Sequence, residues 1–206
     1  MQLRFATGLT STEYVTQEAW RNATLEHCPL HAQGACSFAR HGTYERVSPP
    51  GTRIPRWYCP QGHCTFSLLA DCFAARLTGT LVELEAAVDH VEQSRTLEDA
   101  VAELRLEIDL PGVLRWTRRR LQAIHAVLTT LKGLMPEPFV HCAPTLASFR
   151  QLLAVEWVLI ALRARAAVHL SHLPPPLGFR PPLRRGGEHS DTHQHRAGPD
   201  PPHVLA

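Results

Sequence analysis

Cys28-Pro-Leu-His31 and Cys59-Pro-Gln-Gly-His63 are two short-spaced pairs of metal-binding side chains, separated by residues 32–58. Cysteine and histidine ligands grouped in close pairs on turns are typical of tetrahedral Zn²⁺ sites. Between the pairs, Arg40–Val47 and Thr52–Tyr58 have the pattern of two strands joined by the turn Ser48-Pro49-Pro50-Gly51. We therefore predict a small zinc ribbon over residues 28–75, a β-hairpin with two metal-binding turns.

The predicted metal is a structural Zn²⁺ ion. Its four predicted ligands are Cys28, His31, Cys59 and His63, with Cys36 and Cys64 as alternates, because either thiol can replace a histidine. The competing interpretation is a set of free cysteines in a small β domain. A segment of about 45 residues has too little core to fold unaided, which favours the metal. A catalytic zinc would need a nearby carboxylate, and Glu45 is the only acidic residue between His31 and His63.

Several further segments extend the pattern around the two pairs. They are Arg40-His-Gly-Thr-Tyr-Glu-Arg46, Arg53-Ile-Pro-Arg-Trp-Tyr-Cys-Pro60 and Thr65-Phe-Ser-Leu-Leu69. With Cys28-Pro-Leu-His31 before them, they resemble the N-terminal zinc ribbon of small bacterial proteins related to insertion-sequence transposases. The resemblance covers residues 28–132, more weakly beyond residue 80. It implies nucleic-acid binding in the context of a mobile element, although many members of the family have no assigned activity.

The chain departs from the family pattern at three positions. The family often has Cys-x-x-Cys at both pairs, followed by Gly-Arg-Thr-Phe-Ser-Leu-Leu-Pro. Here His31 stands in the place of the second cysteine and Gly62 in the place of the fourth ligand, with His63 and Cys64 directly after it. Ala70 replaces the usual proline. The resemblance therefore supports Cys28 and Cys59 as ligands more directly than it supports a fourth ligand.

The rest of the chain is predicted to be mainly helical, which makes the whole an α+β protein. Residues 1–27 form an N-terminal helical segment, with a helix over Thr12–Thr24. From Leu81 the apolar spacing changes from about 2 to about 3.6, which marks a helical domain over residues 80–172. Its predicted helices are Leu81–Ser94, Leu97–Leu106, Val113–Leu131 and Thr145–Leu170. Residues 173–206 are rich in proline and polar residues, which predicts a disordered tail.

Charge is segregated along the predicted helices. Leu81 to Pro111 contains nine acidic residues and two arginines, whereas Gly112 to Lys132 contains five basic residues and no acid. A short helix, a turn and an Arg-rich helix is the order found in helix-turn-helix proteins, whose second helix enters the major groove. We predict a helix-turn-helix-like unit over residues 97–131, with DNA contacts from Arg115, Arg118, Arg119 and Arg120. The competing interpretation is a solvated basic face that pairs with the acidic helix.

The predicted hairpin offers a second basic surface. Arg40, Arg46, Arg53 and Arg56 are interleaved with Tyr44, Trp57 and Tyr58. We predict that Arg46, Arg53 and Arg56 make secondary DNA contacts. The sequence contains no Walker loop, no Gly-x-Ser-x-Gly elbow and no set of separated carboxylates for two metal ions, so we expect no catalytic centre. The predicted function is zinc-dependent DNA binding, related to transposition or accessory to a mobile element. The alternative is a zinc-stabilised protein-interaction module that binds no nucleic acid.

Composition sets the expected compartment and partners. The net charge is +2 and no apolar run reaches the 18 residues that a membrane span requires. The N-terminus lacks the pattern of a secretory signal, and the close Cys and His spacing favours metal over disulfides. We expect a cytoplasmic protein, associated with the nucleoid if it binds DNA. Its expected partners are DNA and a second copy or a mobile-element protein, without a membrane or a small-molecule substrate.

Overall fold

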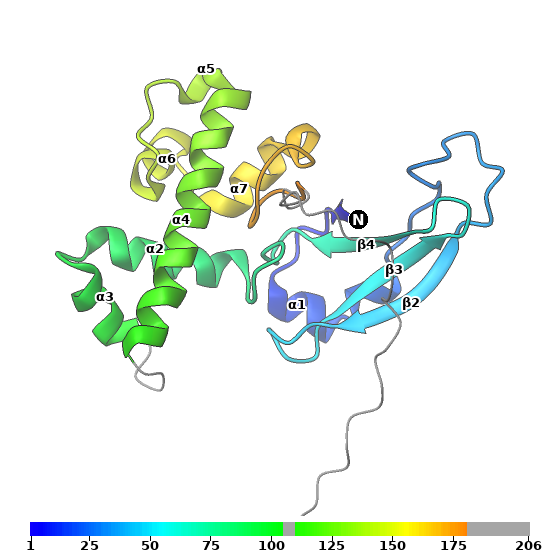
Figure 1. Ribbon diagram of the computed structural model, residues 1–206, viewed down its shortest axis with the longest axis horizontal. Helices are drawn as coiled ribbons and strands as arrows, with labels where there is room; N and C mark the ends of the chain where they lie inside the picture. The colour runs from blue at the N-terminus through cyan, green and yellow to red at the C-terminus, as the bar shows by residue number, and fades with distance from the viewer. Residues whose placement is uncertain (105–109, 181–206) are drawn as a thin grey trace, which may run out of the picture.

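The computed structural model describes residues 1–104 and 110–180 of the 206-residue chain and confirms a mixed α+β fold. A four-stranded sheet lies at one side of the molecule and most of the helices at the other (Figure 1). In chain order the elements are β1 (Gln2–Phe5), α1 (Ser11–Thr16), η1 (Ala19–Arg21), β2 (Ala39–Glu45), β3 (Arg53–Cys59), β4 (Cys64–Ala70), α2 (Leu81–Gln93), α3 (Leu97–Leu104), α4 (Leu110–Leu134), α5 (Pro136–Phe139), α6 (Leu146–Leu153), α7 (Val158–Arg165) and η2 (Ala167–His169). Among the described helices, none is long and apolar enough to cross a lipid bilayer.

The sheet has the strand order β1-β4-β3-β2. Strands β2 and β3 form the predicted antiparallel hairpin, and β4 pairs antiparallel with β3, so that Trp57 lies opposite Phe66. The N-terminal segment predicted as helical also contains a strand, because β1 pairs in parallel with β4 at the edge of the sheet. Four residues are too few to show a strand period, so no signal for β1 was present in the sequence.

The first helix is shorter than the predicted Thr12–Thr24. Thr10 is its N-cap, and its hydroxyl accepts a hydrogen bond from the backbone N–H of Glu13, whose carboxylate accepts one from the backbone of Thr10 in return. Glu18 takes a left-handed backbone conformation with φ of 47°, which ends the helical run before η1. Tyr14 and Trp20 then face the interior, and both are almost fully buried.

The predicted helix over Thr145–Leu170 is divided into α6, α7 and η2. Ala154 has a left-handed backbone (φ 52°) and ends α6, and the extended residue Trp157 precedes α7. The fully buried Glu85 of α2 accepts hydrogen bonds of 2.8 Å from the backbone N–H groups of Val158 and Leu159 at the start of α7. A tertiary partner therefore satisfies the donors that a continuous helix would have satisfied internally.

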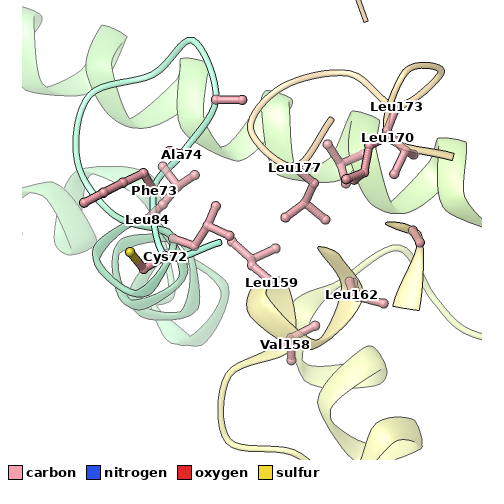
Figure 2. Close-up of a cluster of buried hydrophobic side chains, with 14 of the residues drawn as sticks. Cys72, Phe73, Ala74, Leu84, Val158, Leu159, Leu162, Leu170, Leu173 and Leu177 are labelled. Carbon is pink, nitrogen blue, oxygen red and sulfur yellow. The ribbon is translucent and has the colours of Figure 1, made fainter. Parts of the chain in front are cut away.

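One apolar core joins the sheet to the helices. It contains Tyr14 of α1, Ile54 and Leu69 of the sheet, and buried residues of α2, α4, α6 and α7. Figure 2 shows its centre, where the connection from β4 to α2 meets α7. Leu173, Leu177 and Phe179 belong to the same core. The predicted disordered tail therefore begins too early, since residues 173–180 are packed, and the remainder, residues 181–206, falls outside the described residues.

Arg163 of α7 fixes this last segment to the sheet. Its side chain is fully buried, and its guanidinium donates hydrogen bonds to the backbone carbonyls of Leu177, Asp71, Phe73 and Pro176. Burial lowers the pKa of this guanidinium to about 10. Carbonyl oxygens from two separate loops thus surround one cation, which holds residues 176–177 against the end of β4.

Candidate metal centre and nucleic-acid interface

Four ligand atoms converge at the end of the sheet remote from the helices. They belong to Cys28, His31, Cys36 and Cys59, and all lie within 4.8 Å of one another. The long loop between η1 and β2, seen beside the hairpin in Figure 1, supplies three of these side chains, and the end of β3 supplies Cys59. Cys28 and Cys59 are buried, and none of these thiols forms a disulfide. The structure therefore confirms a Cys and His cluster at the sheet.

The spacing of the four atoms suits a closed tetrahedral zinc site. The Nδ1 atom of His31 lies 3.4 Å from the sulfurs of both Cys28 and Cys59. Zn–S bonds of about 2.3 Å and Zn–N bonds of about 2.0–2.1 Å at tetrahedral angles place sulfur and nitrogen ligands about 3.5 Å apart. Three sulfurs and one imidazole nitrogen leave no position for a reacting water. These residues therefore fit a zinc ion that holds the loop in place.

The thiols of the cluster have opposite pKa shifts. Burial opposes ionisation of Cys28, but hydrogen bonds from His31, the backbone at Leu30, Cys59 and Cys36 together lower the pKa of its thiol to about 7. Burial and the neighbouring thiols Cys28 and Cys59 raise the pKa of Cys36 to about 11. Several thiolates cannot share this small volume without a cation. A divalent metal would supply the positive charge and displace the protons.

His63, predicted as the fourth ligand, lies outside the cluster, and Cys36 takes its place. The chain turns tightly from Pro60 to His63, whose backbone is left-handed (φ 45°) and whose side chain is exposed. Cys64, the other alternate, is the register partner of Cys59 in the first pair of β4, and it is not in the cluster either.

Gly62, in the middle of this turn, faces the cluster. A Cβ atom at position 62 would lie 3.5 Å from the sulfur of Cys59 and 3.7 Å from Cε1 of His31. The backbone N–H of Gly62 also donates to the sulfur of Cys59 at 3.3 Å. Position 62 is therefore where a ligand on this turn would point, and glycine leaves that direction to Cys36 from the opposite loop.

Cys36 reaches the cluster because the loop reverses immediately before it. Gly34 and Ala35 both have left-handed backbones, with φ of 82° and 64°. Cys36 then leads into Phe38, which packs edge-on against Phe66 in the small core beside the cluster. The glycine at position 34 was the signal available in the sequence, although a spacing of five residues from His31 is not typical of a metal-binding turn.

Three of the four arginines predicted as main DNA contacts are exposed on α4. Arg115, Arg118 and Arg119 project into solvent, and across residues 1–104 and 110–180 none of them has a hydrogen-bond or ion-pair partner. Arg120 differs, because the turn of about 100° per residue carries it to another side of the helix. It is 9% exposed, stacks 3.6 Å from the ring of Trp116 and donates to the hydroxyl of Thr78. Arg120 is therefore a packing residue in the structure, which does not favour its predicted contact with DNA.

The arginines of the hairpin also have different roles. Arg46 donates to the backbone carbonyls of Ser48, Ala74, Leu77 and Gly79, so it organises the loop before α2 and is not a free contact for DNA. Burial lowers the pKa of its guanidinium. Arg53 is exposed, whereas Arg56 is half-buried and lies 5.6 Å from the ring of Tyr44. Arg53 and Arg56 are an odd number of residues apart on β3, so they lie on opposite faces of the sheet.

The structure also places beside Arg53 two basic residues that were not among the named DNA contacts. Arg21 of η1 and Arg40 of β2 lie beside Arg53 and line one depression with it.

Comparison with models of protein families gives no match, and no characterised protein or solved structure is significantly similar to this chain.

Proposed function

We propose that this protein binds DNA without catalysing a reaction on it, and that a structural zinc ion stabilises its sheet. In this proposal Arg115, Arg118 and Arg119 on α4 are the main contacts, and Arg53 on β3 is a further one. An origin in, or an accessory role to, a mobile element follows only from the sequence resemblance and belongs to the same proposal.

The observation that carries the proposal is that the three arginines have no ion-pair partner among the described residues. If the basic face of α4 existed to pair with the acidic helix α3, ion pairs between them would be expected. Within the described residues Arg115, Arg118 and Arg119 pair with no carboxylate, although Glu98 and Asp99 are exposed on α3, which packs against α4. Three guanidinium groups on one helical stripe are suited to the closely spaced phosphates of duplex DNA.

The position of these arginines supports a helix-turn-helix mode of binding. They lie in the first half of α4, and α3 packs against the same helix. In such proteins the N-terminal part of the second helix reaches base edges in the major groove. The predicted turn between the two helices includes residues 105–109, which lie outside the described residues. The mode of binding is thus proposed from the arginine stripe and the packing of α3 alone.

Zinc has a supporting role in the proposal. Residues 22–38 contain no helix or strand, and they connect η1 to β2. A metal held by Cys28, His31 and Cys36 from this loop and by Cys59 from β3 would tie the loop to the sheet. Small cores commonly need such a metal for stability.

The test is salt-dependent binding of the zinc-loaded full chain to duplex DNA of mixed sequence. Replacing Arg115, Arg118 and Arg119 together by Gln should reduce the slope of log K against log[salt] by about 0.9 for each phosphate that the variant no longer neutralises. The matched control is Arg165→Gln, because Arg165 is also an exposed helical arginine but lies on α7. It should leave the slope unchanged.

Two outcomes would refute the proposal. One is that the wild-type protein shows no salt-dependent affinity for duplex DNA, in which case the protein-interaction alternative gains support. The other is that the triple variant and Arg165→Gln lose affinity equally, which would indicate a general charge effect. A further variant, Arg118→Lys, tests the geometry of the contact, since lysine keeps the positive charge but lacks the planar fork of donors that arginine presents.

A further inference from the structure

We propose that a depression on the sheet beside η1 is a binding site for a phosphate group of a nucleic-acid strand. The depression has a volume of about 350 Å³ and is lined by Trp20, Arg21, Arg40, Thr43 and Arg53. Three of the five lining side chains are cationic and a fourth carries a hydroxyl group. It is separate from the arginine stripe on α4. The assignment of its ligand to a nucleic acid depends on the proposed function, whereas its predicted affinity for phosphate does not.

Strand register gathers these side chains on one face of the hairpin. In β2, Arg40 lies opposite Trp57, Thr43 opposite Pro55 and Glu45 opposite Arg53. Arg53, Pro55 and Trp57 alternate along β3 and so share a face, and their register partners share it too. The irregularity in β2 between Arg40 and Thr43 keeps both residues on that face. Short helix η1 packs beside β3 and adds Arg21.

The structure already holds the guanidinium group of Arg40 and the backbone of Arg53 in place. Arg40 donates to the carbonyls of Trp20 (2.6 Å) and Arg21 (3.0 Å) and lies 5.5 Å from the ring of Trp57. These bonds use two of its five N–H groups, which leaves three for a ligand. The backbone of Arg53 is fixed by the hydroxyl of Tyr14, which donates to its carbonyl at 2.9 Å. A side chain fixed as Arg40 is loses little entropy when it binds an anion.

The charges around the depression favour an anion. Arg21 is paired with Glu18 at 2.6 Å, and this bond, with the field of Arg53, lowers the pKa of the Glu18 carboxyl. Glu45 is the register neighbour of Arg53, but no ion pair joins them in the described part of the chain. Three cations thus face two carboxylates, and the guanidinium of Arg53 has no hydrogen-bond partner among the described residues.

A phosphate group suits these donors better than a carboxylate. Guanidinium groups bind phosphate oxygens through two parallel N–H bonds, and a phosphate has enough oxygens for several donors at once. The Thr43 hydroxyl adds a neutral donor. No described acidic side chain lines the depression, so a divalent cation has no ligands there.

The first experiment titrates inorganic phosphate into the zinc-loaded full chain at constant ionic strength. The indole N–H resonance of Trp20, assigned with Trp20→Phe, reports on the depression by NMR. We expect a saturable shift at Trp20, and a loss of phosphate affinity of about tenfold or more in Arg53→Gln, because Arg53 makes charge-assisted bonds to the anion. Arg165→Gln is the control and should retain the wild-type affinity. Absence of a saturable shift at Trp20, or equal affinities of Arg53→Gln and wild type, would overturn the site.

The second experiment separates a nucleic acid from free phosphate as the source of the group. If the site contacts DNA, Arg53→Gln should reduce the salt slope of duplex binding by about 0.9, the value for one phosphate. Inorganic phosphate should also compete with DNA at the Trp20 resonance. If Arg53→Gln weakens binding of inorganic phosphate but leaves DNA binding unchanged, the assignment to a nucleic-acid strand is wrong and the site takes free phosphate. If the wild type binds phosphate but no DNA, the proposed function fails while the phosphate site stands.

Discussion

Replacing Cys36 by Ser tests the fourth metal ligand directly. Loss of an outer-shell partner of a metal ligand commonly costs 10–100-fold in metal affinity. Cys36 is in direct reach of the other three ligand atoms, all within 4.8 Å. We therefore expect Cys36→Ser to lower zinc affinity more than about 100-fold, which is more than about 2.8 kcal/mol. His63→Ala and Cys64→Ser should leave zinc affinity close to that of the wild type.

A second substitution should restore the site from the other loop. The Cβ position of residue 62 is 3.5 Å from the Cys59 sulfur, so a thiol one bond further on can reach the metal. The same Cβ would lie 2.6 Å from Cδ1 of Leu30, but Leu30 is 47% exposed and its side chain can rotate away. That rotation costs about 0.5–1.5 kcal/mol, or roughly tenfold in affinity. The double variant Cys36→Ser/Gly62→Cys should thus bind zinc within about tenfold of the wild type.

The assay is competition for zinc with a chromophoric chelator at neutral pH, with stoichiometry measured on the same samples. The reasoning fails if Cys36→Ser binds zinc as tightly as the wild type while His63→Ala does not. Failure of Gly62→Cys to improve the Cys36→Ser variant would show that the turn from Pro60 to His63 does not point into the site.

Three further predictions concern the metal and the buried polar groups. As the pH falls below the thiol pKa values, with Cys28 near 7, protons displace zinc, so its affinity should drop by more than about tenfold per pH unit in the same competition assay. Glu85→Ala should lower the free energy of unfolding by about 3–5 kcal/mol in urea, because it leaves two buried N–H groups without their acceptor and removes the buried one of the two carboxylates bound to Arg150. Asp89→Asn, at the more exposed carboxylate partner of Arg150, should cost about 1 kcal/mol or less. Arg46→Gln should cost at least about 1.5–3 kcal/mol in urea and leave the salt slope of DNA binding unchanged, since Arg46 bonds only to backbone carbonyls.

The sequence predicted best where local spacing determines structure. The hairpin, the helix from Leu81 and three members of the metal cluster follow from periods and short intervals in the chain, and the structure contains them all. The fourth member did not follow, because Cys36 depends on a reversal at residues 34 and 35 that sets a three-dimensional path. If each of the two turns is assumed to supply two ligands, the fourth ligand is assigned to His63 instead.

Tertiary contacts explain the other differences. Leu146 to Leu170 has an apolar spacing compatible with one helix, but Glu85, distant in sequence, caps a new helix at Val158. The prolines near residue 175 suggested disorder, yet Arg163 binds the carbonyls of that segment. The different position of Arg120 could have been predicted from helical geometry alone. A rotation of about 100° per residue turns it away from the stripe of Arg115, Arg118 and Arg119.

The core described above also constrains how the chain can fold during synthesis. Its members run from Tyr14 to Phe179, and the buried cation of Arg163 has its carbonyl acceptors partly in residues 176–177. A nascent chain lengthens from the N-terminus, so the sheet and α2 emerge from the ribosome well before the side chains that complete their apolar face. Until residue 179 has emerged, Phe73 and Leu84 lack part of their covering. During synthesis the sheet and α2 therefore expose apolar surface until the C-terminal part of the core has emerged. Chaperones bind nascent chains in this condition.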